Sequence, residues 1–136
     1  MIMGIKISNW KINQEVLESI MEFSKSFYPL EFSGLLYCDI DKQIITDIYI
    51  LPGTHSGRTS AVLRMDLAPM TFNLAGSVHS HPSGYGDASG ADLNFFSGKQ
   101  INIIAYPPFS LDSYKAYNKQ GELVAIKVIP KEKNKI

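Results

Sequence analysis

Apolar residues recur at three- and four-residue steps in the stretch from residue 13 to residue 28. This spacing lines one face of a helix, because side chains three and four positions apart lie one above another. Asn13 suits the N-cap position, and Pro29 disfavours helical geometry at the residue before it. The pattern therefore predicts one amphipathic helix over residues 13–28. Its apolar positions are Val16, Leu17, Ile20, Met21, Phe23 and Phe27.

After this helix the pattern changes to short runs rich in β-branched, aromatic and aliphatic residues, which predict strands. Two polar stretches, residues 39–42 and 118–121, are typical of hairpin turns, so much of the sheet is expected to be antiparallel or mixed. Residues 87–98 contain no proline and place Leu93 and Phe96 at helical spacing, which predicts a second helix. The predicted strands are residues 34–38, 44–51, 61–65, 74–79, 101–106, 114–117 and 123–129.

These elements indicate an α/β or α+β sandwich, in which helices cover a mixed sheet. A chain of 136 residues with 45% hydrophobic composition is close to the usual size and composition of one domain. Neither a repeat, a low-complexity segment nor a linker interrupts the pattern. We therefore expect a single domain over residues 1–136, with a frayed charged tail at residues 131–136.

Charge and cysteine content limit the partners and the setting. The 13 basic and 13 acidic residues cancel, so no general attraction to nucleic acid or to a membrane surface is expected. Cys38 is the single cysteine, which excludes an intramolecular disulfide and a zinc site built mainly from thiolates. We expect Cys38 to be a small buried apolar residue. Because no apolar stretch approaches the ~20 residues of a membrane span and the start is not signal-like, we expect a soluble, cytoplasmic protein.

The stretch HSHPSGYGDASGAD, residues 79–92, concentrates groups that bind metals. Side chains two apart on a strand point to the same face, so His79 and His81 are expected to converge at the end of their strand. Pro82 helps to end the strand. Asp92 falls in the first turns of the predicted second helix, from which its carboxylate can reach back to the histidines. Two imidazoles, one carboxylate and an open fourth position are the ligand pattern of a catalytic zinc.

Each part of this stretch also has a simpler interpretation. The two histidines can be exposed residues at a strand end, and Ser89 with Asp92 resembles a helix capping box. Asp87 is another candidate cap, which leaves Ser89 inside the first turn and free for chemistry. The combined spacing favours a metal site over these separate explanations.

The stretch reads H-x-H-P, six residues and then S-x-x-D, and it resembles the motif of the JAMM (MPN-plus) metalloproteases, which cleave isopeptide bonds at the C-termini of ubiquitin and ubiquitin-like proteins. The resemblance implies that His79, His81 and Asp92 hold one Zn²⁺ per chain. It also implies that Ser89 helps to stabilise the tetrahedral intermediate. Proline often precedes this serine in the family, whereas Ala88 stands there in this chain. Alanine is a good helix former, so the difference is expected to be harmless.

Attack of zinc-bound water on an amide also needs a general base, and the residues named so far supply no free carboxylate. Glu31 stands just before a run that is expected to be a fully buried strand, where Gly34 allows close backbone approach. A carboxylate at that position has few structural reasons to be there. The other glutamates considered, which are expected on solvated surfaces, are Glu15, Glu18, Glu22 and Glu122.

The segment EFSGLL, residues 31–36, is similar to the E-x-x-G-L-L-like stretch that contains the catalytic glutamate of the JAMM family. This resemblance implies that Glu31 takes a proton from the zinc-bound water, and that hydroxide attacks the scissile carbonyl while zinc and Ser89 stabilise the oxyanion. Glu31 then protonates the departing lysine amine. The expected activity is that of a zinc-dependent isopeptidase.

The resemblance covers residues 29–106 by motif and implies the MPN fold, a mixed sheet sandwiched by helices and related to the cytidine deaminases. The short stretch 66–73 makes the chain more similar to small archaeal and bacterial members, which implies a conjugate of a ubiquitin-like modifier or sulfur-carrier protein as substrate. An extended substrate tail ending in Gly-Gly can add as a strand to a sheet edge, for which residues 54–65 are the candidate. His55 and Arg58 lie in this segment, where solvated loop residues are the simpler interpretation.

Two other functions fit part of the pattern. Members of the family without the motif are scaffolds that bind partners without catalysis, and the full ligand set argues against this class. RadC-like proteins share an H-x-H-P-S-G stretch, which residues 79–84 match, so this alternative stays open. A nucleoside deaminase is not indicated, because the H-x-E and P-C-x-x-C sequences are absent.

Overall fold

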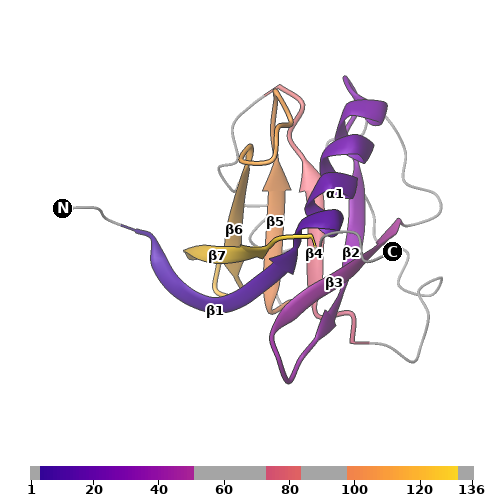
Figure 1. The fold of residues 1–136 in the computed structure, drawn as a ribbon. Helices are drawn as coiled ribbons and strands as arrows, with labels where there is room; N and C mark the ends of the chain where they lie inside the picture. Colours follow the sequence, from indigo (N-terminus) through magenta and orange to yellow (C-terminus); the bar gives the residue numbers. More distant parts are fainter. Residues whose placement is uncertain (1–3, 51–72, 84–97, 132–136) are drawn as a thin grey trace, which may run out of the picture.

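The computed structural model of the chain describes residues 4–50, 73–83 and 98–131. One helix and seven strands follow one another along these residues (Figure 1). The strand predicted over residues 61–65 lies outside the described part, as does the helix predicted over residues 87–98 except for Gly98. In chain order the elements are β1 (Lys6–Asn13), α1 (Gln14–Phe27), β2 (Ser33–Asp39), β3 (Ile44–Ile50), β4 (Gly76–Ser80), β5 (Ile101–Ala105), β6 (Tyr114–Asn118) and β7 (Leu123–Ile129).

Helix α1 confirms the predicted amphipathic pattern and is one residue shorter at each end than the prediction. Asn13 occupies the N-cap position, but its side chain makes no capping hydrogen bond. The helix ends at Phe27, because Tyr28, which precedes Pro29, adopts an extended ψ of 134°. Burying an aliphatic side chain stabilises a fold by about 1.5–3 kcal/mol, so packing on the sheet holds the helix. Its buried residues are Val16, Leu17, Ile20, Met21 and Ser24.

The strands form one mixed sheet in the order β1-β3-β2-β4-β5-β6-β7, and β7 pairs with β1 so that the sheet closes into a barrel. The pairs β1–β3, β1–β7 and β4–β5 are parallel, and the other neighbours are antiparallel. Hairpin turns join β2 to β3 and β6 to β7, as predicted. In the second turn, the Asn118 side chain accepts hydrogen bonds from the amides of Gln120 and Glu122. The predicted mixed sheet is confirmed. Its closure into a barrel was not predicted.

Strand β1 is absent from the predicted elements. Its apolar residues Ile7, Trp10 and Ile12 do not alternate, because the register with β7 shifts between Ile7 and Lys11. The shift reverses the face to which alternate residues point, so Ile7 is 94% exposed whereas Trp10 and Ile12 are buried. Because apolar and polar residues do not alternate along β1, the sequence pattern does not predict this strand.

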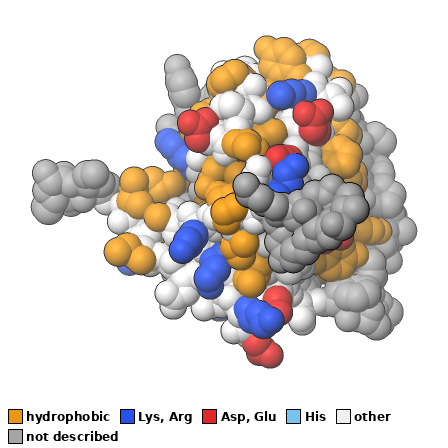
Figure 2. Space-filling model, in the orientation of Figure 1, with side chains coloured by type: hydrophobic (Ala, Val, Ile, Leu, Met, Phe, Trp, Pro, Cys, Tyr) orange, Lys and Arg blue, Asp and Glu red, His pale blue; other side chains and the backbone are white. Residues whose placement is uncertain are grey.

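One large hydrophobic core lies between α1 and the sheet, and it takes side chains from every described strand. Cys38, which the sequence predicts to be buried, belongs to it, and so does Trp10. Figure 1 shows α1 lying across one face of the sheet, and Figure 2 shows charged side chains of both signs dispersed over this side of the molecule. In the described ranges, no helix has the length and apolar character needed to cross a bilayer. Because α1 covers one face of β4, residues that alternate with the core positions point to the other face.

Candidate functional site

The two histidines lie at the end of β4, on the face that points away from the core. Val78 belongs to the core, so by alternation Ser77 and His79 point to the opposite face. The His81 amide donates a 2.8 Å hydrogen bond to the carbonyl of Ala105, which keeps His81 beside β5 after β4 has ended. The two imidazole centroids are 5.1 Å apart, with an angle of 50° between the ring planes. The predicted convergence of His79 and His81 is confirmed.

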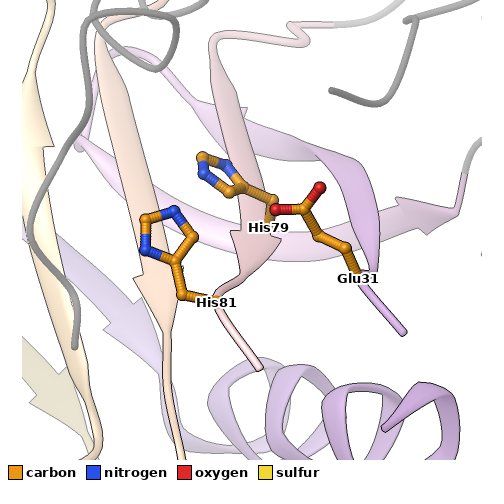
Figure 3. Close-up of side chains that lie close together, drawn as sticks. All are labelled: Glu31, His79 and His81. Atoms are coloured by element: carbon orange, nitrogen blue, oxygen red, sulfur yellow. The ribbon is translucent and has the colours of Figure 1, made fainter. Parts of the chain in front are cut away.

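Glu31 is brought to these histidines by the antiparallel pairing of β2 with β4. Ser33 lies opposite His79 in this register. Continuing the register by two residues sets Glu31 opposite His81 and on the same face of the sheet. One carboxylate oxygen of Glu31 and one nitrogen of each imidazole lie within 4.8 Å of one another. Figure 3 shows the carboxylate pointing toward the histidines, although residues 31 and 79 are far apart in sequence.

The cluster of Glu31, His79 and His81 lies at the margin of the buried part of the sheet. His79 is 5% exposed, whereas Glu31 and His81 are half-buried. Imidazole nitrogens and carboxylate oxygens are donors that suit Zn²⁺ and other divalent first-row ions. These residues therefore fit a metal ion and could hold one.

Ser89 and Asp92, the predicted oxyanion-stabilising residue and third zinc ligand, lie outside the described residues, as does Asp87. The candidate substrate edge at residues 54–65, with His55 and Arg58, is also outside them. The roles of all these residues stay predictions from the sequence. The part of the site that the structure describes consists of Glu31 and the two histidines.

The other glutamates considered have different surroundings. Glu18 forms an ion pair of 3.0 Å with Lys131, and Glu122 forms one of 2.8 Å with Lys6. In each pair, the hydrogen bond from the lysine holds the pKa of the carboxyl below its ordinary value. A carboxylate with a lowered pKa and a lysine partner is a poor general base. The remaining two, exposed on α1 as predicted, are Glu15 and Glu22.

Cys38 is buried in the core, as the sequence predicts. Burial raises the pKa of its thiol from 9.0 to about 12. The thiol is therefore protonated at neutral pH, and a protonated thiol is neither a nucleophile nor a metal ligand.

Ser80, which lies between the two histidines in the sequence, is fully buried and is not among the site residues predicted from the sequence. Its side chain accepts a 2.9 Å hydrogen bond from the amide of Phe32. The signal that points to it is the alternation along β4. Gly76, Val78 and Ser80 share the core face of this strand, where a buried hydroxyl needs a partner.

A family model described as "Halobacterial JAB/MPN domain protein" matches residues 26–135. The chain belongs to this JAB/MPN domain family. A relative from Haloferax volcanii, named "Probable metalloprotease", is 36% identical over 126 aligned residues, which cover 87% of this chain and 78% of the relative. The range that the family model matches includes every predicted site residue, namely Glu31, His79, His81, Ser89 and Asp92.

Two solved structures that are 30% identical to this JAB/MPN chain share its fold. A JAB1/MPN domain protein from Archaeoglobus fulgidus has a TM-score of 0.70 over 90% of this chain and 98% of that one. A structure described as "JAMM: A Metalloprotease-like Zinc Site in the Proteasome and Signalosome" has a TM-score of 0.69 over 90% and 99%. A protein from Desulfitobacterium hafniense, with 20% identity and a TM-score of 0.67 over 90% and 93%, shares the fold alone. The predicted MPN fold and JAMM membership are confirmed, so the chain is a member of a metalloprotease-like family.

Proposed function

We propose that this protein is a zinc-dependent isopeptidase, which hydrolyses the bond after the C-terminal glycine of a ubiquitin-like modifier or sulfur-carrier protein. The proposal rests on the cluster of one carboxylate and two imidazoles, whose ligand atoms lie within 4.8 Å of one another. Membership of a metalloprotease-like family supports hydrolysis of a peptide-type bond as the reaction.

His79 and His81 would hold Zn²⁺ together with Asp92, with one ion per chain. Three protein ligands leave one coordination position open, which is the arrangement of catalytic rather than structural zinc. When bound, the ion supplies Lewis-acid chemistry: it polarises the scissile carbonyl and lowers the pKa of water towards neutrality. The neighbour described as carrying a metalloprotease-like zinc site supports the choice of this metal.

Glu31 acts as the general base and then as the general acid. One of its carboxylate oxygens takes a proton from the attacking water and returns it to the lysine amine that leaves. Glu31 is half-buried, and its carboxylate faces the histidines. Ser89 donates a hydrogen bond to the oxyanion that forms on the scissile carbonyl.

The substrate presents an extended tail that ends in Gly-Gly. Glycine has no side chain, so a Gly-Gly tail would fit even a narrow approach to the metal. Main-chain hydrogen bonds to residues 54–65 would hold the tail as an added strand. This mode of binding selects for an extended C-terminus rather than for a folded loop of the substrate.

The test is hydrolysis of a ubiquitin-like protein whose C-terminal Gly-Gly is joined by an amide bond to aminomethylcoumarin. Wild-type protein is expected to release the fluorophore, to stop when a chelator is added, and to resume when Zn²⁺ is restored. His79→Ala is expected to lose both zinc and hydrolysis. A zinc-loaded wild type that releases nothing from this probe or from a lysine-linked conjugate contradicts the proposal and favours the RadC-like or scaffold alternatives.

A further inference from the structure

Ser80 and Phe32 form an irregular hydrogen-bonded pair just beyond the last paired residues of β2 and β4, Ser33 and His79. The amide of Ser80 donates a 2.9 Å hydrogen bond to the carbonyl of Phe32, and its hydroxyl accepts a 2.9 Å bond from the amide of Phe32. In a regular hydrogen-bonded pair of antiparallel strands, the carbonyl of Ser80 would accept the second bond. The side chain has taken the place of the backbone at the point where the strands meet the candidate site.

With this arrangement, two successive residues hydrogen-bond to segments on opposite sides of β4. Ser80 bonds to Phe32 on the β2 side, and the amide of His81 bonds to Ala105 on the β5 side. Phe32 is also anchored by its ring, whose centroid lies 5.7 Å from that of Phe23 on α1 and 5.5 Å from that of Phe27. Glu31 is the residue next to this anchor, so its backbone position depends on the place of Phe32.

We propose that Ser80 is a positioning residue, whose buried hydroxyl fixes the Phe32 amide and thereby holds the Glu31 carboxylate beside His79 and His81. The inference rests on the proposed function of Glu31 as general base. Ser80 is fully buried and faces away from the histidines, so it acts through Phe32 rather than by contact with substrate. Without the hydroxyl, the Phe32 amide has to move to find another acceptor, because a buried amide seldom stays unsatisfied. Misplacement of a reacting group by about 1 Å lowers a rate by up to about 100-fold.

The experiment compares Ser80→Ala and Ser80→Thr in the full chain with Ser77→Ala as the matched control. Ser77 is equally buried on the same strand, but its hydroxyl bonds to Asn102 rather than to Phe32. Ser80→Ala is expected to speed amide hydrogen exchange at Phe32, to lower kcat on the coumarin probe by about 10- to 100-fold, and to leave KM and zinc content unchanged. Ser80→Thr keeps a hydroxyl and is expected to restore both slow exchange and kcat. Ser77→Ala is expected to keep wild-type kcat and wild-type exchange at Phe32.

Equal loss of kcat in Ser80→Ala and Ser77→Ala overturns the inference, because it shows a general cost of losing a buried hydroxyl. Ser80→Cys, which keeps the volume and offers only a weak acceptor, replaces Ser80→Ala if the alanine variant does not fold. Unchanged kcat and unchanged exchange at Phe32 in Ser80→Cys would then overturn it. If wild type cleaves no probe, the proposed function has failed, and a crystal structure of Ser80→Ala decides the inference by itself. Displacement of the Glu31 carboxylate from the imidazoles supports the positioning role. A carboxylate oxygen that stays within 4.8 Å of one nitrogen of each imidazole, as in the wild type, overturns it.

Discussion

Glu31 and Glu122 both stand just before a strand, yet one faces two imidazoles and the other faces a lysine. Glu122 belongs to the turn between β6 and β7, where it also accepts a 2.8 Å hydrogen bond from the Asn118 side chain. Its partners tie together a turn at the surface. Glu31 precedes β2, and the pairing of β2 with β4 sets it opposite His81. Strand pairing, rather than the place of a glutamate in the sequence pattern, therefore determines which carboxylate reaches the histidines.

The largest expected difference between the two glutamates is in kcat when each is replaced by glutamine. Glu31→Gln keeps the shape of the side chain but cannot accept the proton of water, so kcat on the coumarin probe is expected to fall by about 10²–10⁴-fold. Its zinc content is expected to stay at the wild-type value, because the three proposed zinc ligands are unchanged. Glu122→Gln, the matched control, is expected to keep full activity. A zinc-bound and fully active Glu31→Gln protein would falsify the assignment of the base.

The residues that follow the two glutamates differ in how firmly they anchor the chain. Phe32 is fully buried against two rings of α1, whereas Leu123 is half-buried beside a small cluster of Ile104 and Tyr117. Phe32→Ala is expected to lower the free energy of unfolding by about 3–5 kcal/mol. Leu123→Ala is expected to lower it by about 1 kcal/mol, the centre of the range for point mutations. Urea unfolding measures the free energy of unfolding of both variants. Equal losses would show that the chain beside Glu31 is packed no more firmly than the chain beside Glu122.

The smallest expected effect is the pH-dependent stability that Glu122 contributes. Lys6 and, to a smaller extent, Asn118 lower the pKa of its carboxyl from 4.5. Since the folded state then binds the proton less readily than the unfolded state, this stabilisation is present above 4.5 and is lost as pH falls through the lowered pKa. Glu122→Gln is expected to have a slightly lower Tm than wild type at about pH 7, and this difference in Tm is expected to shrink as pH is lowered below 4.5.

Salt provides a control for this last effect, because the ion pair of Glu122 and Lys6 is exposed and screened by added ions. The difference in Tm between wild type and Glu122→Gln is expected to shrink as salt is raised at neutral pH. A difference that stays constant with both pH and salt would show that the charge of the carboxylate does not stabilise the turn.

The elements that could be predicted from sequence are those with a regular period. Strand β7 begins and ends where the sequence predicts, and α1 differs from its prediction by one residue at each end. Strand β1 could not be predicted, because a register shift between Ile7 and Lys11 breaks its alternation. The closure of the sheet could not be predicted either, since it depends on the pairing of β1 with β7, two strands at opposite ends of the chain.

The site divides in the same way. The convergence of His79 and His81 is a local property of residues two apart on a strand, so the sequence alone predicts it. The approach of Glu31 depends on the register between β2 and β4. From the sequence, the position of Glu31 before a buried strand and the resemblance of its segment to a known motif pointed to this residue, but neither gave its distance from the histidines. The bond between Ser80 and Phe32 depends on the same register, and no motif marked it. Local periodicity therefore predicts which residues share a face, but not which residues lie across a strand pair.

The most direct test of the proposed site is a crystal structure of the zinc-loaded protein with anomalous data collected at the zinc edge. We expect one anomalous peak per chain, at about 2.0–2.1 Å from one imidazole nitrogen of His79 and one of His81. The Glu31 carboxylate is expected to face this peak without binding to it, as a base for water requires. A structure with no peak between the histidines, or with Glu31 bound directly to the ion, would contradict the proposed centre.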